Sequence, residues 1–296
     1  MKLPYPLLII VLLSSFLKAF SQKVYTVKLP AEDKKIIRGH LNLGGKNPEG
    51  DSVSVNSYFI EINNKPFIPI VGEFHYSRYP SEYWEESILK MKAGGVNVIA
   101  SYVFWNIHER KEGVFDWSGN LDLRKFITLC EKHNIFTIVR IGPFGHGEMR
   151  NGGLPDWLYG RPFEVRSNDE GYLFYVDRLY AEIGKQLAGK LYQDGGTILG
   201  VQLENEYQHS AAPWEITYPG SVKESTIAYW DENVTHAGVS VSDRKNEYAR
   251  YGQEHMLNLK KIANKAGIVA PIYTATGWGN AAIIQKGSIP VTAGYV

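Results

Sequence analysis

Near-continuous apolar runs alternate with segments of helical periodicity along most of this 296-residue chain. Runs without a polar residue at every second position predict strands that are buried on both faces of a sheet. Between the runs, apolar residues recur at a spacing of three or four, which predicts amphipathic helices that cover those faces. The predicted strands are residues 66–70, 96–103, 136–141, 198–203 and 271–276. The predicted stripes are Trp84, Ile88 and Met91, then Leu179, Ile183, Leu187 and Leu191, then Leu259, Ile262 and Ala263.

Two α/β architectures fit this alternation: an open doubly wound sheet and a (β/α)8 TIM barrel. The first βα turn has no glycine-rich phosphate loop, whereas polar or aromatic residues follow every predicted strand, as in barrel active sites. The barrel is therefore favoured. A complete barrel takes about 250 residues or more. Five βα units already occupy nearly all of the chain, so we expect an incomplete TIM barrel over residues 56–296.

The amino-terminal residues 1–21 have the pattern of a signal peptide. Lys2 precedes an apolar stretch from Leu7 to Leu17, and Ala19-Phe20-Ser21 forms a small-x-small cleavage site. The apolar stretch is about half of the ~20 residues that span a bilayer. Export to the periplasm or the extracellular space is therefore favoured over a membrane anchor.

Residues 22–55 are predicted to be an amino-terminal lead-in rather than a separate domain, because turn signals interrupt them repeatedly. Residues 58–62 and 66–70 flank Asn63-Asn64-Lys65, which predicts a hairpin that feeds the first buried strand.

Composition narrows the classes of partner. The formal charge of +1 gives no electrostatic reason to expect nucleic acid or an anionic membrane. The single cysteine, Cys130, excludes an intrachain disulfide and a cysteine-based metal site. Its spacing from Phe126 and Leu129 predicts a packing role on a buried helical face. No cofactor is expected.

Hydrogen-bonding and aromatic side chains follow four of the predicted strands. The carboxyl ends of parallel strands meet at one edge of a sheet, so these side chains would line one opening. Such a lining suits a polyhydroxylated substrate. The residues are Glu73, His75, Tyr76 and Arg78; Tyr102, Trp105, Asn106, His108 and Glu109; His146, Glu148 and Trp157; Asn205, Glu206 and Tyr207.

Glu206 is the candidate proton donor, because an apolar strand delivers Asn205-Glu206 at its carboxyl end. A carboxyl group in such apolar surroundings keeps its proton more readily than one in water, as a general acid requires. The competing interpretation is a surface carboxylate at a helix start. Glu204 alternates to the other side of the strand and is predicted to be structural.

Five segments together resemble glycoside hydrolase family 35, which consists largely of β-galactosidases of the retaining (β/α)8 clan. The resemblance runs from about residue 58 to 210 in order and spacing. The segments are Phe74-His75-Tyr76-Ser77-Arg78, Tyr102-Val103-Phe104-Trp105-Asn106-Ile107-His108-Glu109, Arg140-Ile141-Gly142-Pro143, Gly152-Gly153-Leu154-Pro155-Asp156-Trp157-Leu158 and Gln202-Leu203-Glu204-Asn205-Glu206-Tyr207.

The resemblance implies roles for individual residues. Glu206 corresponds to the general acid/base, and Asn205 to its neighbour that contacts the sugar 2-hydroxyl. Tyr102 and Glu148 correspond to positions that hold the galactose hydroxyls, with Gly147 beside them. Three positions depart from the family pattern: Gly147 and Met149 stand where alanine and tryptophan are usual, and His146 replaces a common cysteine.

The function implied is a retaining β-galactosidase that hydrolyses terminal non-reducing β-D-galactosyl residues of an oligosaccharide or glycan. Retention needs a second carboxylate about 5–5.5 Å from the first, as nucleophile. The family takes that residue from a later strand, and residues 255–296 contain no Asp or Glu. Glu148 and Glu109 match binding and scaffold positions instead. We therefore expect the nucleophile to be absent and this chain alone to hydrolyse β-galactosides negligibly.

Two further interpretations stay open at this point. A non-catalytic remnant would bind galactosides through Tyr102, Glu148 and Asn205 without turnover, and calorimetric titration with galactose would reveal it. A metal-dependent barrel hydrolase would use His75 and other histidines that follow the strands, with zinc detectable by elemental analysis. The histidines form no His-x-His pair, so no metal site is expected.

Overall fold

The computed structural model describes residues 25–27, 36, 38, 44–56, 59–207, 247–276 and 291–293. The chain divides into two units, Met1–Lys35 and Ile36–Val296. In the first unit, residues 25–27 are exposed and outside any helix or strand. The predicted signal peptide and the polar insertion after residue 207 lie outside the described residues. Among the helices that are described, none is long and apolar enough to cross a membrane.

A small antiparallel sheet comes first in the second unit, with its strands in the order β1-β2-β3-β4. Asn63 and Asn64 have φ angles of 52° and 59°, the left-handed conformation that a two-residue hairpin turn requires. The predicted hairpin is therefore confirmed as the β3–β4 connection. The strands are β1 (Gly44–Lys46), β2 (Ser52–Val55), β3 (Ile60–Ile62) and β4 (Lys65–Phe67).

The prediction of a buried strand over residues 66–70 is wrong. Pro66 belongs to β4, at the edge of the antiparallel sheet, where a residue without an N–H donor is tolerated. Ile68 and Ile70 lie outside any strand and are 72% and 49% exposed. The parallel sheet begins one residue later, with β5 (Val71–Glu73). An apolar run alone does not distinguish these two situations.

The second sheet is parallel, and its strands follow chain order, β5-β6-β7-β8-β9-β10. Every residue of β6 and β8 is buried, as predicted for strands covered on both faces. The fold is an incomplete (β/α)8 barrel. Five strands were expected from the sequence, and β10 was not among them. The strands after β5 are β6 (Val98–Tyr102), β7 (Phe136–Gly142), β8 (Ile198–Leu203), β9 (Ile272–Thr276) and β10 (Val291–Ala293).

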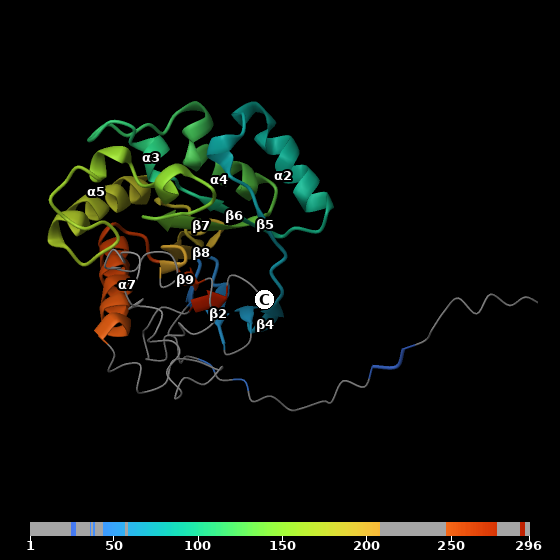
Figure 1. Cartoon of the computed structure of the whole chain (residues 1–296). Helices are drawn as coiled ribbons and strands as arrows, with labels where there is room; N and C mark the ends of the chain where they lie inside the picture. The colour runs from blue at the N-terminus through green and yellow to red at the C-terminus, as the bar shows by residue number, and fades with distance from the viewer. Residues whose placement is uncertain are drawn as a thin grey trace, which may run out of the picture. The chain divides into compact units, whose positions relative to one another are not determined.

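Helices α2, α4 and α5 lie along one side of the parallel sheet (Figure 1). Asp122 and Asp169 cap α4 and α5 by accepting backbone N–H groups, each at 2.8 Å. The predicted extension of the α5 stripe to Leu191 is wrong, because the helix ends at Leu187 and Gly189 turns the chain at φ 73°. The helices are α2 (Trp84–Ala93), α3 (Trp105–His108), α4 (Leu123–Lys132), α5 (Glu170–Leu187) and α7 (Glu247–Lys265).

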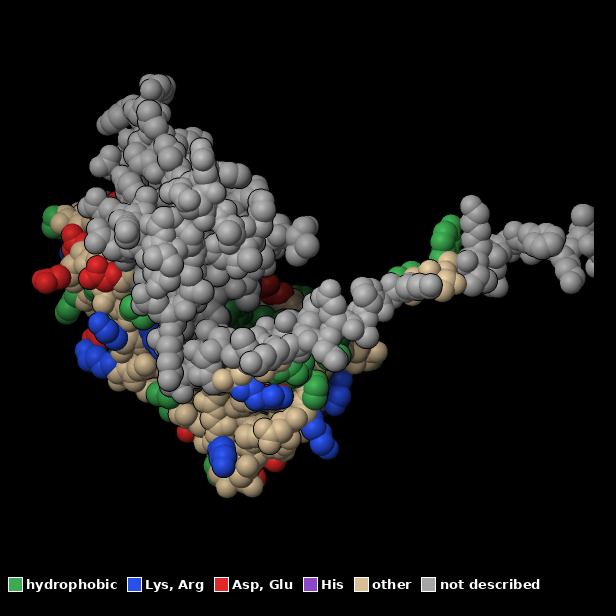
Figure 2. Space-filling view, turned by 90° about the horizontal axis from the view of Figure 1, so that it is seen from below, with side chains coloured by type: hydrophobic (Ala, Val, Ile, Leu, Met, Phe, Trp, Pro, Cys, Tyr) green, Lys and Arg blue, Asp and Glu red, His purple; other side chains and the backbone are tan. Residues whose placement is uncertain are grey.

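One large apolar core fills the space between the parallel sheet and its helices. Cys130 is fully buried in it, and burial raises the pKa of this thiol to about 12, which confirms a packing role. A second cluster joins Val53 of β2 to Leu199 of β8 and Tyr192. Figure 2 shows Lys and Arg side chains in several separate places, with Asp and Glu side chains among them, on the described part of the face seen from below.

Candidate active site

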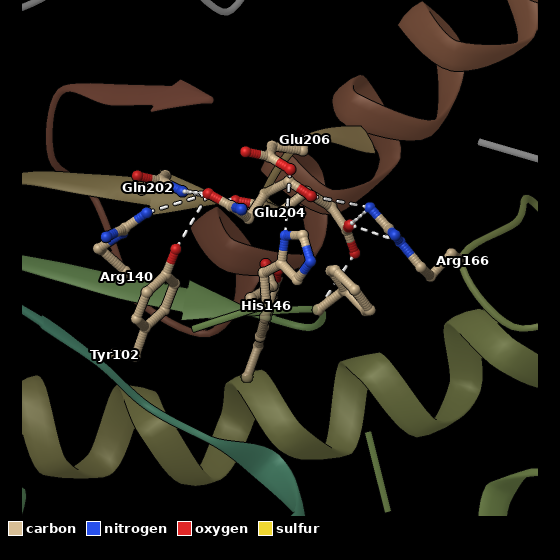
Figure 3. A network of polar contacts seen from close by, with 11 residues as sticks. Tyr102, Arg140, His146, Arg166, Gln202, Glu204 and Glu206 are labelled. Atoms are coloured by element: carbon tan, nitrogen blue, oxygen red, sulfur yellow. Dashed lines mark hydrogen bonds and ion pairs between the residues drawn. The ribbon is translucent and has the colours of Figure 1, made fainter. Parts of the chain in front are cut away.

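Arg140 links the carboxyl ends of four parallel strands (Figure 3). Its Nη1 donates to Glu73 Oε1 at 2.7 Å, and its Nη2 donates to Asn205 Oδ1 at 3.0 Å. The guanidinium also lies 3.6 Å from the ring centre of Tyr102. The strand register explains this position, because Arg140 is opposite Tyr102 on β6 and Gln202 on β8. Sequence reasoning did not assign Arg140 a role, although a charged residue within an apolar strand was an available signal.

Asn205 is held by three donors that converge on one atom. Its Oδ1 accepts from the Tyr102 hydroxyl at 3.0 Å, Arg140 Nη2 at 3.0 Å and Gln202 Nε2 at 3.2 Å. These contacts determine which end of the amide is oxygen. The Nδ2 group is therefore the end that can donate to a substrate hydroxyl. The structure thus brings Tyr102 and Asn205 together.

Glu206 follows Asn205 directly, and its side chain is 10% exposed. Its Oε2 lies 3.1 Å from Nδ1 of His146, which is half-exposed and belongs to the loop after β7 (Figure 3). The backbone is left-handed at Glu204 and Glu206, with φ angles of 53° and 48°. Such conformations cost about 1–3 kcal/mol each and occur mainly where the surrounding structure enforces them at functional sites.

Glu204 points away from His146 and into the protein. Its fully buried carboxylate pairs with Arg166, whose Nε lies 2.9 Å and Nη2 2.7 Å from Oε2. Burial raises the pKa of Glu204, while the Arg166 guanidinium and the amide of Phe144 act in the opposite direction. This arrangement agrees with the structural role predicted for Glu204, but the predicted reason is wrong. Strand alternation would put residues 204 and 206 on the same side, and the left-handed backbone at both residues separates them instead. Arg166 lies in a loop without a motif, and sequence reasoning gave no sign of it.

Glu148 and Gly147 lie on the same loop as His146. A Cβ atom placed on Gly147 would lie 3.0 Å from Phe104 Cζ and 3.4 Å from Tyr102 Cδ2, so this backbone packs on both rings. Glu148 is exposed, with φ 50°. Burial lowers the pKa of His75, and the Glu73 and Glu148 carboxylates oppose that shift. The loop therefore places Glu148 close enough to His75 for its charge to affect the pKa of that imidazole.

The histidines that suggested a metal site have separate partners. The fully buried His108 uses both ring nitrogens, on the Tyr76 hydroxyl at 2.6 Å and the Asp116 carbonyl at 2.9 Å. His75 lies 3.4 Å from Glu73, whereas His146 contacts Glu206. In the part of the chain that the structure describes, no three His, Cys, Asp or Glu side chains are grouped to hold a metal. The geometry gives the metal interpretation no support.

Glu109 is a fully buried scaffold residue, as the sequence resemblance implied. It accepts from Trp105 Nε1 and the Gly113 amide, each at 2.6 Å, and pairs with Arg178. The Trp157 indole donates to the Glu109 carbonyl at 3.0 Å. Both oxygens of this fully buried carboxylate are thus engaged by internal donors, which is incompatible with attack on a substrate.

Known β-galactosidases are similar to this chain over about half of its length. It is 43% identical to the mouse protein named beta-galactosidase over 146 residues, which is 49% of this chain and 23% of that protein. It is 45% identical to beta-galactosidase 11 of Oryza sativa subsp. japonica over 141 residues, 47% of this chain and 17% of that protein. The human beta-galactosidase-1-like protein 2 is 42% identical over 137 residues, 46% of this chain and 22% of that protein.

The chain therefore spans roughly a fifth of the length of these relatives. Among solved structures, an exo-beta-1,4-mannosidase from Opitutaceae bacterium strain TAV5 overlaps 79% of this chain and 33% of its own, at 14% identity and a TM-score of 0.47. The profile of one family matches residues 59–286, which include the whole site described above. The chain belongs to glycosyl hydrolases family 35.

Proposed function

We propose that the protein is a retaining β-galactosidase and that Glu206 is its general acid/base. The observation that carries the proposal is the Asn205-Glu206 pair at the carboxyl end of β8. Three donors hold the Asn205 amide, and the adjacent carboxyl contacts His146 at 3.1 Å. The β-galactosidases among its relatives support galactose as the sugar recognised.

The geometry suits the two halves of a retaining reaction. In the first half, protonated Glu206 gives its proton to the glycosidic oxygen while a second carboxylate, which the proposal does not take from this chain, attacks the anomeric carbon. In the second half, the Glu206 carboxylate removes a proton from the water that releases galactose. Asn205 Nδ2 is placed to donate to the sugar 2-hydroxyl. The proposal assigns the nucleophile neither to Glu109, which is buried, nor to Glu73, which Arg140 and His75 engage.

Substrate binding is assigned to Tyr102, Gly147, Glu148 and Asn205. The Tyr102 hydroxyl donates to Asn205, so its oxygen is available to accept from a sugar hydroxyl. The exposed Glu148 carboxylate supplies a strong acceptor at the same opening. The proposed partner is a β-galactoside oligosaccharide or glycan, encountered by an exported protein that needs no cofactor.

The test is the Glu206→Gln variant of the protein expressed from its complete gene, with Glu82→Gln as a control at an exposed carboxylate. Hydrolysis of 4-nitrophenyl β-galactoside should fall about 10²–10⁴-fold in Glu206→Gln and stay unchanged in the control. A 2,4-dinitrophenyl leaving group needs little protonation, so its departure should be affected much less. Azide needs no general base, and it should therefore restore turnover by forming β-galactosyl azide.

A Glu206→Gln protein with full activity would refute the assignment of the acid/base. Calorimetric binding of galactose by a complete wild-type protein that hydrolyses no β-galactoside would instead favour the non-catalytic interpretation.

A further inference from the structure

Arg166 and Glu204 form a buried ion pair directly behind the proposed catalytic residues. The two side chains are 3% and 0% exposed, and the Arg166 Nη2 lies 2.7 Å from Glu204 Oε2. The same Nη2 donates to the backbone carbonyl of Asn205 at 3.0 Å. One guanidinium therefore holds a side chain and a main-chain atom of adjacent residues, immediately before Glu206.

Further hydrogen bonds attach Glu204 to the end of β7 and to its own strand, β8. Its N–H donates to the Gly142 carbonyl at 2.8 Å, and its Oε1 accepts from the Phe144 N–H at 3.3 Å. Its carbonyl accepts from Gln202 Nε2 at 2.7 Å. The Arg166 guanidinium also lies 3.7 Å from the Phe144 ring centre. Arg166 thus joins the exit of β7 to the exit of β8.

These contacts are needed because the backbone from Glu204 to Glu206 does not continue the extended conformation of β8. Residues two apart in a strand project on the same side. Here Glu204 points inward to Arg166, whereas Glu206 points to His146 (Figure 3). The positive φ angles of Glu204 and Glu206 make this divergence possible. Left-handed backbone persists in non-glycine residues only where surrounding contacts enforce it.

We propose that Arg166, acting through Glu204, is a positioning residue that keeps the Glu206 carboxyl directed at the substrate. A planar guanidinium suits this role, because its fixed fork contacts the carboxylate and the Asn205 carbonyl at once, and a lysine ammonium lacks that fork. The proposal rests on the proposed function of Glu206. It adds that the catalytic geometry is set by a residue far from it in sequence and out of reach of the substrate.

Two variants, made like the Glu206 variant in the protein expressed from its complete gene, separate positioning from stability. Arg166→Met leaves the Glu204 charge buried and unpaired, so it should lower the unfolding midpoint as well as kcat. Arg166→Met/Glu204→Leu removes both charges and should recover the midpoint. Its kcat should stay about tenfold to a hundredfold below wild type, because the Asn205 carbonyl is still released. KM should change by less than about threefold, since the sugar-binding side chains stay in place.

Arg178→Met is the matched control, because it also breaks an ion pair with a buried carboxylate, Glu109, away from this turn. It should lower the unfolding midpoint and leave kcat within about twofold of wild type at temperatures where the protein is folded. A double variant that regains kcat together with stability would show that the Arg166–Glu204 pair is merely structural and overturn the proposal.

A second readout does not depend on catalysis. The imidazole nitrogen signals of His146, observed by NMR, should change on Glu206→Gln, because the two side chains touch. In the Arg166→Met/Glu204→Leu background, the same substitution should leave these signals unchanged. Persistence of the change there would contradict the positioning proposal. If the His146 signals no longer respond to Glu206→Gln in that background, and the complete wild-type protein has no galactosidase activity, the positioning proposal is supported. Only the proposed function is then rejected.

Discussion

The Nδ1 atom of His146, in the loop that follows β7, lies 3.1 Å from Oε2 of Glu206. An imidazole N–H at that distance donates to a carboxylate and also to the carbonyl oxygen of a protonated carboxyl. The contact can therefore persist whether the Glu206 carboxyl is protonated or ionised, as the proposed function requires. This neighbour distinguishes the chain from the cysteine-containing pattern that its family usually shows.

His146→Ala should lower kcat/KM for aryl β-galactosides by about tenfold, since a hydrogen bond to an ionised group contributes about 1.5–3 kcal/mol. His133→Ala is a suitable control, because His133 makes a similar 2.7 Å contact to Glu85 away from the site. Steady-state kinetics of both variants measures the difference. Equal rates in wild type and His146→Ala would show that the contact has no catalytic effect.

Asn205→Asp should keep the fold and lower activity. The three donors that converge on Oδ1 are satisfied equally by a carboxylate, but the Nδ2 donor is lost. We expect kcat/KM to fall about tenfold or more for a galactoside with a 2-hydroxyl. On the matching 2-deoxygalactoside the penalty should largely disappear. A penalty of the same size on both substrates would contradict the assigned contact.

Gly147→Ala should weaken galactoside binding. A Cβ at this position would lie 3.0 Å from Phe104 Cζ, on a backbone with φ 54°, so the loop that carries Glu148 has to shift. KM should rise about fivefold to tenfold, since strain of this kind costs about 1–3 kcal/mol. Gly160→Ala is the control, because a Cβ there meets nothing within 4 Å. An unchanged KM in Gly147→Ala would contradict the placement of this loop.

Two buried histidines should make the protein sensitive to acid. Burial lowers the pKa of His255 to about 3 and that of His108 to about 4, from an ordinary value of 6.5. Between those values and 6.5 the unfolded chain binds more protons than the folded chain. The free energy of unfolding therefore falls as pH falls through this window, by up to about 1.4 kcal/mol per pH unit for each histidine.

Urea unfolding of wild type and His255→Phe between pH 7 and pH 4.5 measures this effect. Phenylalanine preserves a ring against Tyr207 and Tyr172, the two rings stacked on His255. The variant should lose less stability on acidification than wild type. Identical slopes would show that His255 does not titrate in this window.

The strands that sequence analysis located best are those with the strongest apolar runs. β8 spans Ile198–Leu203 as predicted, because both of its faces are buried and its run ends abruptly at Glu204. The start of the barrel was misplaced, since the apolar run from Pro66 to Ile70 contains two different local structures, the end of β4 and a segment outside any strand. The predicted apolar stripe of α5 was extended too far. Leu191 lies in the loop after the helix, but it is as buried as a residue of the helix would be, so its apolar character gave no sign that the helix had ended.

For the site, local motifs were sufficient to predict Tyr102, Asn205 and Glu206 as neighbours, because parallel strands align their carboxyl ends. They were not sufficient for Arg140 and Arg166. Arg140 owes its role to the register that places it across from Gln202. The role of Arg166 depends on a loop folding back over the turn after β8, and this is a property of the tertiary structure alone.

The ring stack between Tyr207 and His255, with centres 4.7 Å apart, has an evolutionary consequence. Tyr207 follows β8 and His255 belongs to α7, so the described residues on the two sides of the stretch between them are in contact. Closing a longer loop costs only slightly more entropy than closing a shorter one. Homologues are therefore expected to differ widely in the length of this connection while preserving Glu206 next to it.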